Sequence, residues 1–343
     1  MTNLDNLKVY RDEDIDKSFI KDKKIAVIGY GSQGYGQSMN LKDSGCNVAL
    51  GLRKDGASFK KAQLENFKIM DVEEAVKWAD IVQVLIPDEI QAKVYKEQIE
   101  PNLKEGQYLM FSHGFNIHFN KIVAPKDVNV IMVAPKGPGH AVRSEYLAGK
   151  GVPSLIAVYQ DFSGASKEVS LAYAQAIGSG RAGILETDFK QETETDLFGE
   201  QSVLCGGCTE LIKAGFETLV EGGYSPYMAY FEVLHELKLI VDLVNQGGLS
   251  DMFYSISNTA EYGAYSRGKR VITDETKKAM KGILSEIQSG KFADEFMNEF
   301  DSGCKNFAET RKENEELQIE KVGKEIRAAF SWGKDKMIDR ERN

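Results

Sequence analysis

The chain has 343 residues, enough for two domains with separate hydrophobic cores. Its composition, with 28% charged and 42% apolar residues, is that of a globular protein, and no apolar run approaches the roughly 20 residues of a membrane-spanning helix. The net charge of −9 argues against nucleic acid as a partner, because surfaces that bind nucleic acid are basic. We therefore expect a soluble protein without a membrane or nucleic-acid partner.

The N-terminus and the cysteines indicate the compartment. MTNLDNLKVYRDEDIDKSF is acidic and lacks the basic start and apolar stretch of a secretion signal. The chain has only four cysteines, too few for a disulfide framework, so we expect a cytoplasmic location. Cys205 and Cys208 form a CGGC sequence in a helix-like run without a second pair, and we interpret its two glycines as close helix packing, not as a redox or zinc site.

Short β-type runs alternate with helical segments through the first half of the chain. The runs are KIAVIGY (24–30), NVALGLR (47–53), DIVQVLIP (80–87), QYLMFSHG (107–114), NVIMVAP (129–135) and SLIAVYQ (154–160). This alternation predicts a doubly wound, mainly parallel sheet. After about Asp188, apolar residues recur three and four apart through Trp332, which predicts helices only. We expect an α/β Rossmann domain over 1–188, an all-α domain over 189–334 and a tail over 335–343.

A glycine-rich turn follows the first predicted strand. VIGYGSQGYG places Gly29, Gly31 and Gly34 in G-x-G-x-x-G spacing where a helix should begin. In a dinucleotide site the first glycine permits the tight turn, the second lets a pyrophosphate approach the backbone, and the helix N-terminus supplies N–H donors. A merely glycine-rich turn is the alternative, but the position between strand and helix favours a nicotinamide cofactor.

The loop after the second predicted strand bears on which cofactor binds. NAD enzymes usually carry an acidic residue there for the ribose hydroxyls. In GLRKDGAS, Arg53 and Lys54 come first and Ser58 follows, a combination that suits a 2′-phosphate and favours NADPH. Asp55 keeps NAD open as an alternative.

Three further strand ends point to the same edge of the sheet, where ligands of such sheets bind. Pro87 ends the third run, and Asp88–Gln91 can begin a helix beside the cofactor. His113 follows the fourth run and can exchange a proton, whereas we expect His118 to be an ordinary turn residue. After the fifth run, Lys136 with Gly139 combines a cation with room for close backbone approach to a ligand.

The helical half carries two pairs of acidic residues at four-residue spacing. Asp196 and Glu200 share one side of their predicted helix. A second helix is predicted from the cap residue Ser225 to a stop at Gly247. At 100° per residue, Glu232 and Glu236 lie about 110° from its polar side. If the two pairs converge, each pair of like charges 4 Å apart costs about 4 kcal/mol at an effective dielectric near 20, so a cation is needed.

Oxygen ligands without a cysteine and histidine cluster favour Mg²⁺, and two ions can share one carboxylate. The alternative is that the two acidic helix faces are solvated separately. For Glu192 and Glu194 we favour that alternative, so that only Asp196 and Glu200 of the acidic run QETETDLFGEQ serve as ligands.

These motifs together resemble the ketol-acid reductoisomerase (acetohydroxy-acid isomeroreductase) family, in its short class I type. The resemblance covers nearly the whole chain and rests on GYGSQGYGQSMNLKDSG, PDEIQ, SHGFNIHF, VAPKGPGH, ETETDLFGEQSVLCGG, YFEVLHELKLIVDL, SISNTAEYG and IEKVG, in family order. It implies a Rossmann domain, a knotted all-helical domain, and a homodimer or higher homo-oligomer with shared active sites.

The resemblance also implies substrates and roles. The substrates would be 2-acetolactate and 2-aceto-2-hydroxybutyrate, isomerised by alkyl migration and reduced by NADPH on the route to valine, leucine and isoleucine. Asp196 would bridge two Mg²⁺, with Glu200, Glu232 and Glu236 as further ligands, and Ser257 would contact the substrate carboxylate. His113 and Lys136 would be catalytic. Cofactor-binding positions would be Tyr30, Gly31, Ser32, Gln33, Arg53, Ser58, Asp88, Glu89, Ile90, Gln91 and Gly139.

The chain departs from the family pattern at two places. Gly56 stands where a second serine is common in the phosphate-binding loop, which weakens the prediction of NADPH. Gly36 stands where alanine is common, a small change that we expect to be tolerated. Two functions of other classes remain as alternatives: a hydroxy-acid dehydrogenase without a metal, and a catalytically silent nucleotide-binding regulator.

Overall fold

The chain forms two compact units, divided between Thr193 and Glu194. The computed structural model describes residues 8–54 and 56–330. The division falls inside helix α9 (Phe189–Gly199), later than the predicted boundary after residue 188. The predicted tail, 335–343, lies outside the described residues, and so does Asp55.

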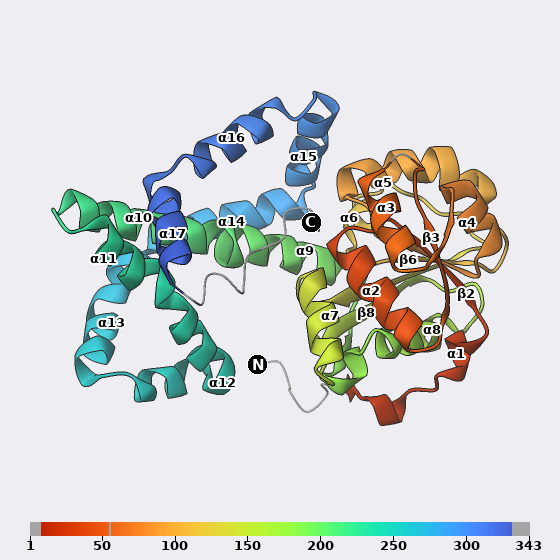
Figure 1. Ribbon diagram of the computed structural model, residues 1–343, viewed down its shortest axis with the longest axis horizontal. Helices are drawn as coiled ribbons and strands as arrows, with labels where there is room; N and C mark the ends of the chain where they lie inside the picture. Colours follow the sequence, from red (N-terminus) through yellow and green to blue (C-terminus); the bar gives the residue numbers. More distant parts are fainter. Residues whose placement is uncertain (1–7, 55, 331–343) are drawn as a thin grey trace. The chain divides into compact units, whose positions relative to one another are not determined.

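The first unit is built on a nine-stranded sheet in the order β1-β9-β8-β7-β6-β5-β2-β3-β4 (Figure 1). Its strands are β1 (Val9–Tyr10), β2 (Lys24–Ile28), β3 (Asn47–Gly51), β4 (Lys68–Met70), β5 (Ile81–Val84), β6 (Tyr108–Phe111), β7 (Asn129–Pro135), β8 (Ser154–Gln160) and β9 (Ile184–Glu186). From β4 across to β7, all neighbouring strands are parallel. The predicted doubly wound, mainly parallel sheet is confirmed.

Every β-type run predicted from the sequence forms a strand, and the differences lie at the margins of the sheet. The short strands β1, β4 and β9 were not predicted, because two or three residues do not make a periodic pattern. Strand β8 runs antiparallel to β7, with Pro135 paired to Ser154. The intervening helix α7 therefore returns the chain to the edge it left instead of crossing the sheet, and it packs against α2.

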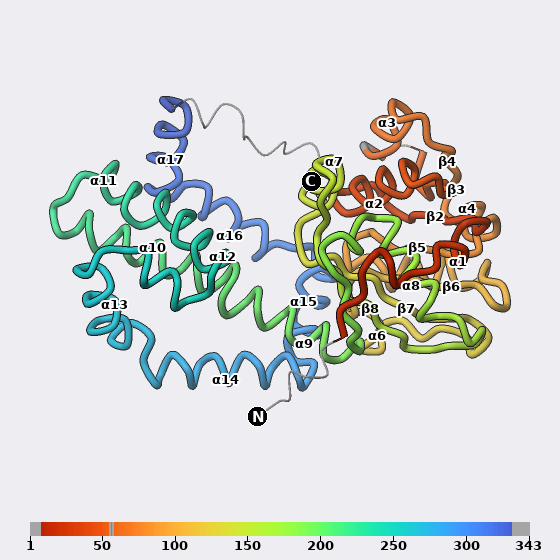
Figure 2. Tube along the Cα trace, turned by 90° about the horizontal axis from the view of Figure 1, so that it is seen from below, coloured from red at the N-terminus to blue at the C-terminus, as the bar shows by residue number. Residues whose placement is uncertain are grey.

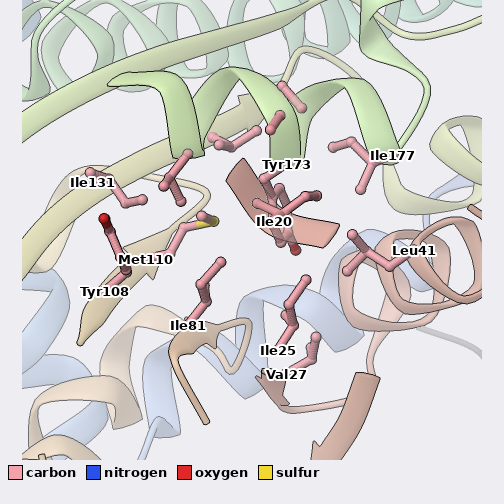
Figure 3. Packing of buried hydrophobic residues seen from close by; sticks show 14 of the residues in the cluster. Ile20, Ile25, Val27, Leu41, Ile81, Tyr108, Met110, Ile131, Tyr173 and Ile177 are labelled. Carbon is pink, nitrogen blue, oxygen red and sulfur yellow. The ribbon is translucent and has the colours of Figure 1, made fainter. Parts of the chain in front are cut away.

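Helices cover both faces of the sheet. In the first unit they are α1 (Ser18–Lys21), α2 (Ser32–Asp43), α3 (Ala57–Leu64), α4 (Val72–Trp78), α5 (Asp88–Val94), α6 (Phe115–His118), α7 (Gly139–Leu147) and α8 (Ser166–Ala176), with short turns η2 (Asp12–Asp14), η3 (Tyr95–Ile99), η4 (Glu100–Asn102) and η5 (Ser179–Arg181). Alternate strand residues point to opposite faces, so Ile25 and Val27 pack on one face and Ala26 and Ile28 on the other. Figure 3 shows the first of these two cores, between the strands and helix α8.

The described residues of the second unit form helices and the connections between them, with no strand. After α9 come the turn η6 (Glu200–Leu204), α10 (Gly206–Glu221), α11 (Pro226–Tyr230), η7 (Phe231–His235), α12 (Leu237–Ser255), α13 (Asn258–Val271), α14 (Asp274–Gln288), α15 (Lys291–Asp301), α16 (Lys305–Glu315) and α17 (Gln318–Ala329). Figure 2 traces these helices by colour from green to blue. Among the helices described, none has the length and apolar character needed to cross a membrane. The knot stays a prediction.

π-helical turns interrupt this unit where acidic residues were predicted to bind metal. Turn η6 begins at Glu200, and turn η7 contains Glu232 and ends just before Glu236. The helix predicted as continuous from Ser225 to Gly247 is therefore divided into α11, η7 and α12, and α12 itself kinks at Gly248, where φ is 76°. A constant 100° per residue does not describe side-chain directions here, because a π turn holds one residue more than an α turn.

The π turn η6 also explains the glycines of the CGGC sequence. A Cβ added at Gly206 would lie 2.1 Å from the carbonyl oxygen of Gln201, and one at Gly207 would lie 2.1 Å from that of Ser202. Each glycine thus accommodates a carbonyl five residues earlier in its own chain. These contacts are with the preceding π turn and not with a second helix, so the predicted close packing of helices stays a prediction.

Candidate active site

The cofactor-binding residues predicted from the sequence lie at the carboxyl edge of the sheet. Strand β2 lies between β3 and β5, so chain connections leave in opposite directions on its two sides, and a crevice is expected there. The three glycines after β2 have distinct roles. Gly29 has φ 104°, a Cβ on Gly34 would lie 2.5 Å from the Gly29 carbonyl oxygen, and nothing lies within 4 Å of a Cβ on Gly31. Only Gly31 leaves open space, as the approach of a pyrophosphate requires.

Other residues of this turn are fixed by contacts with the rest of the first unit. Tyr30 is buried, with its ring edge-on to Tyr35 and Phe67. Burial is the main cause that raises the pKa of its hydroxyl well above the usual value. Ser32 begins α2, and Gln33 donates from Nε2 to the Gly137 carbonyl oxygen at 2.9 Å. The glycine turn and the loop after Lys136 are therefore hydrogen-bonded to each other.

Helices α2 and α7 meet at glycines. A Cβ at Gly36 would lie 2.4 Å from the Gly139 carbonyl oxygen, and one at Gly139 would lie 2.1 Å from the Ser32 carbonyl oxygen. The predicted cofactor position Gly139 is thus buried against the turn itself. This packing requires glycine at position 36. The glycine that stands where alanine is common in the family therefore allows α2 and α7 to lie close together.

The other predicted cofactor residues follow strands β3 and β5, in a loop and in the first turns of helices α3 and α5. Arg53 is exposed after β3, and Ser58 is half-buried at the start of α3, whose N-cap is Gly56. Residues Asp88, Glu89 and Ile90 form the first turn of α5. Gln91 is buried, and its Nε2 donates to the Ile86 carbonyl oxygen at 2.8 Å and to Asp88 Oδ1 at 3.0 Å. Its amide holds the β5–α5 turn in shape.

A buried carboxylate joins the two predicted catalytic residues. Glu192 is 1% exposed, and its Oε1 accepts from Lys136 Nζ at 2.8 Å. Its Oε2 lies 3.1 Å from His113 Nδ1 and accepts from the Gly114 backbone N–H at 3.0 Å. The loop after β6, the loop after β7 and the first turn of α9 thus meet at the side chain of Glu192.

The charges around Glu192 outweigh its burial. Burial by itself raises the pKa of a carboxyl group, but the hydrogen bond and charge of His113, followed by the charge and hydrogen bond of Lys136, lower the pKa of Glu192 to about 2. The carboxylate is therefore ionised at neutral pH. It fixes Nδ1 of His113 toward itself.

Glycine is required beside His113. A Cβ on Gly114 would lie 2.3 Å from Thr193 Oγ1 and 3.0 Å from the Phe189 carbonyl oxygen. This lack of a side chain lets the first turns of α9 pack against the loop after β6, and it brings Glu192 within reach of the Gly114 N–H.

The prediction that Glu192 and Glu194 are solvated was wrong. Glu194 is 7% exposed, and Thr193 between them is fully buried. Phe189, at the start of the same helix, belongs to the apolar core of the first unit, so this end of α9 is inside the protein. A feature of the sequence could have identified Glu192: it precedes Asp196 by four residues, the spacing that joins Asp196 to Glu200.

One cluster among the described residues could hold a metal ion. Single ligand atoms of His113, Glu192 and Asp196 all lie within 4.8 Å of one another. Two carboxylates, one of them buried and ionised, form a donor set that suits a hard cation. Asp196, one of the predicted Mg²⁺ ligands, thus neighbours the centre around Glu192.

The other predicted ligands are not gathered in the described chain. Glu200, Glu232 and Glu236 are exposed and belong to no metal-binding group of three or more found among the described residues. Ser257 is exposed, and its Oγ caps α13 by accepting from the Ala260 N–H at 3.2 Å. Their roles toward metal and substrate stay predictions.

Comparisons with known proteins cover both units. The family model described as acetohydroxy acid isomeroreductase, NADPH-binding domain, matches residues 19–183, and that of the ketol-acid reductoisomerase C-terminal domain matches residues 189–332. The structure of an NADH-preferring ketol-acid reductoisomerase from an uncultured archean is 50% identical, with TM-score 0.92 over 95% of this chain and 100% of that one.

More distant structures share the fold alone. A putative oxidoreductase from Jannaschia sp. CCS1 is 16% identical, with TM-score 0.61 over 78% of this chain and 97% of that one. A semialdehyde dehydrogenase NAD-binding protein from Cupriavidus necator is 19% identical, with TM-score 0.60 over 78% and 99%. The matches to both domains and the 50% identity over nearly the full length decide the family: the chain is a member of the ketol-acid reductoisomerases, oxidoreductases with an N-terminal domain for a nicotinamide cofactor.

Proposed function

We propose that the protein isomerises 2-acetolactate or 2-aceto-2-hydroxybutyrate by Mg²⁺-dependent alkyl migration and then reduces the product with NADPH to the 2,3-dihydroxy acid. The observation that carries the proposal is the buried Glu192, which joins His113 to Lys136 and has Asp196 one helical turn away. This activity would serve valine, leucine and isoleucine synthesis in the cytoplasm.

The chain's residues fit the groups that this chemistry needs. Asp196 is proposed to bridge two Mg²⁺, with Glu200, Glu232 and Glu236 completing their coordination. When bound, the ions polarise the substrate carbonyl and stabilise the negative charge that develops on oxygen during migration, and the nicotinamide supplies the hydride. Gly31 leaves the open space that the cofactor pyrophosphate would occupy.

His113 and Lys136 are proposed to handle protons and orient the substrate. Glu192 accepts hydrogen bonds from both, so it sets their positions relative to each other. Since Nδ1 of His113 faces Glu192, the other nitrogen, Nε2, is the atom proposed to exchange a proton with the substrate oxygen. Lys136, a cation, would favour negative charge on that oxygen. Ser257 would hold the substrate carboxylate.

For the cofactor we propose NADPH over NADH. Arg53 and Ser58 supply a cation and a hydroxyl for the 2′-phosphate, and this favours NADPH. Gly56, which lacks a hydroxyl, and the acidic Asp55 favour NADH instead. The 50% identical archaeal structure is described as NADH-preferring. Comparing kcat/KM with the two cofactors tests the choice. A higher kcat/KM with NADH would assign the loop to the ribose hydroxyls.

We further propose a homodimer, or a larger homo-oligomer, whose helical units complete each other's active sites. The exposed state of Glu232, Glu236 and Ser257 supports this, since ligands that are not gathered within one chain can be supplied by a second copy. Exposed apolar side chains on α12 and α13, such as Leu249, Tyr254 and Tyr262, support it too.

One assay tests the activity against its alternatives. NADPH oxidation is followed with 2-acetolactate, with Mg²⁺ and after removal of divalent ions with EDTA. We expect turnover only with Mg²⁺. Turnover of a simple 2-keto acid that persists in EDTA would favour a metal-free dehydrogenase, and cofactor binding with no turnover of either substrate would favour a nucleotide-binding regulator.

A further inference from the structure

A set of buried amides and hydroxyls lies behind the glycine-rich turn. Gln37 on α2, Gln83 in the middle of β5 and Tyr173 on α8 are each 0% exposed. Figure 3 shows Tyr173 within the apolar core on this face of the sheet. Burying an unpaired amide is costly, so the hydrogen bonds within this set stabilise the core; Gln83 Oε1 is the atom of these three side chains left without a partner.

Gln37 is at the centre of this set. Its Nε2 donates to Gln33 Oε1 at 3.0 Å and to Ser112 Oγ at 3.0 Å. Its Oε1 accepts from Tyr173 Oη at 2.9 Å and from Gln83 Nε2 at 3.4 Å. A primary amide has two N–H groups and two lone pairs, so the side chain of Gln37 is fully hydrogen-bonded and held in one orientation.

The two partners on the nitrogen side lead directly to the proposed active site. Gln33 lies in the cofactor turn and passes a hydrogen bond on to the carbonyl oxygen of Gly137, which follows Lys136. Ser112 precedes His113. The cofactor turn, the His113 loop and the Lys136 loop, which come from three different strand ends, are therefore connected through one amide.

The same network determines what the Ser112 hydroxyl can do. Its oxygen accepts from Gln37 Nε2 at 3.0 Å and from Gln83 Nε2 at 2.8 Å. With both lone pairs occupied, the hydroxyl can only donate, to an acceptor other than these two amides. Ser112 is partly exposed beside His113. Its hydroxyl is therefore a hydrogen-bond donor at the edge of the sheet where ligands are expected.

We propose that Gln37 is a positioning residue for the reaction: its nitrogen side holds the cofactor turn and the two catalytic loops in register, whereas its oxygen-side bond to Tyr173 contributes only to the stability of the core. The proposal rests on the function proposed above. One amide makes both kinds of contact, and the oxygen-side bond to Tyr173 can be removed while the nitrogen-side contacts stay in place.

The test compares Gln37→Met with Tyr173→Phe. Gln37→Met keeps the length of the side chain and removes all its hydrogen bonds, the nitrogen-side pair to Gln33 and Ser112 included. Tyr173→Phe removes a single contact on the oxygen side and leaves both nitrogen-side contacts in place. For each variant, Tm, the Kd for NADPH, and kcat and KM with 2-acetolactate and Mg²⁺ are measured well below Tm.

We expect both variants to lower Tm and only one to alter kinetics. Gln37→Met should raise the Kd for NADPH about 10-fold, the equivalent of one lost net hydrogen bond, and lower kcat about 10- to 100-fold because reacting groups shift. Tyr173→Phe should leave kcat and both KM values within about 2-fold of wild type. If Gln37→Met keeps wild-type kinetics, or if Tyr173→Phe changes them equally, Gln37 is merely structural.

Two further measurements keep the outcome decisive. If Gln37→Met does not fold, Ser112→Ala removes the contact to Gln37 from the other partner. It also leaves buried N–H groups of Gln37 and Gln83 without their acceptor, so Tm should fall, and kcat should fall as well. Unchanged kcat would overturn the proposal. If the wild type does not turn over 2-acetolactate, the proposed function fails. The NADPH Kd values of the two variants then still decide whether Gln37 positions the cofactor turn.

Discussion

The two units of the chain bury their apolar residues to very different extents. In the first unit, buried side chains form two continuous cores, one on each face of the sheet. In the second, the buried cluster comprises only Phe216, Ala229, Tyr230, Ile319, Val322 and Ile326, although the unit includes nine α-helices among its described residues when α9 is counted. Large apolar residues such as Tyr254, 90% exposed, lie on its surface.

This difference has a physical meaning. A sheet covered by helices on both faces buries enough apolar surface to be stable by itself. Helices with one small common core do not, since their stability comes mainly from packing of apolar faces. We infer that the first unit is a complete folding unit and that the second requires further apolar contact. Substitutions in the two units should therefore affect different properties of the protein.

The largest effect is expected at Asp196 in the second unit. Asp196→Asn removes the charge of the proposed bridging ligand, so both isomerisation and reduction should fall at least about 10³-fold while NADPH binding to the first unit is unchanged. Each step is measured, with 2-acetolactate and with the rearranged 3-hydroxy-2-ketoacid, at saturating Mg²⁺.

The Glu200→Gln and Glu236→Gln variants provide the matched comparison. Reduction of the rearranged ketoacid needs less of the metal site than migration does, so these variants should keep part of the reduction and lose isomerisation. Normal isomerisation by Asp196→Asn would mean that the acidic run does not bridge ions.

Glu192 in the first unit comes next. Glu192→Gln keeps the shape but removes the charge that pairs with Lys136 and His113, and we expect kcat to fall about 10²-fold or more. The pH dependence of stability should change as well. In the wild type the pKa of Glu192 is about 2, below its ordinary 4.5, so its stabilising contribution is present above pH 4.5 and is lost as pH falls toward 2.

The matched control is Glu194→Gln, which changes a buried acid two residues further along the same helix. Kinetics and pH-dependent unfolding of the two variants are compared by stopped assay and circular dichroism. Equal losses of kcat in both variants would assign the effect to the packing of α9 instead of to the centre.

Much of the first unit could be predicted from the sequence, and less of the second. Strands such as β2 and β7 are continuous apolar runs with clear turn residues after them, and the cofactor turn follows from glycine spacing. The four-residue spacing places Glu192 on the same side of α9 as Asp196, but its burial was misjudged because burial depends on what α9 packs against. The π turns η6 and η7 were missed because the helical pattern was interpreted with a constant 100° per residue, which a π turn interrupts.

The contrast in burial itself can be tested with surface charges. Leu249 and Tyr254 in α12 are 65% and 90% exposed, and Val123 and Leu147 in the first unit are 69% and 66% exposed. We expect Leu249→Lys with Tyr254→Lys to dissociate the proposed oligomer and lower Tm, since charges in an apolar interface are unfavourable. Val123→Lys with Leu147→Lys should change neither. Light scattering gives the mass of both, and a dimer that survives the first pair would exclude α12 from the interface.

A smaller effect is expected in the cofactor loop of the first unit. Arg53→Asp should raise the KM for NADPH about 10-fold or more, because a carboxylate repels the 2′-phosphate, and should raise the KM for NADH much less. Both constants are measured with 2-acetolactate at saturating Mg²⁺. Equal increases for the two cofactors would show that Arg53 does not contact the group by which they differ.

The smallest effect is expected at two glycines near the start of α2, one required for packing and one for binding. Gly36 faces a backbone carbonyl 2.4 Å from where a Cβ would lie, whereas a Cβ on Gly31 would meet nothing within 4 Å. Gly36→Ala forces α2 and α7 apart and should cost about 1–3 kcal/mol of stability with a modest effect on cofactor affinity. Gly31→Ala should leave Tm unchanged and weaken NADPH binding, because the methyl group occupies the space that a pyrophosphate needs. Urea unfolding and cofactor titration of both variants check this, and a loss of stability in Gly31→Ala equal to that in Gly36→Ala would mean that the open space at Gly31 is not kept for a ligand.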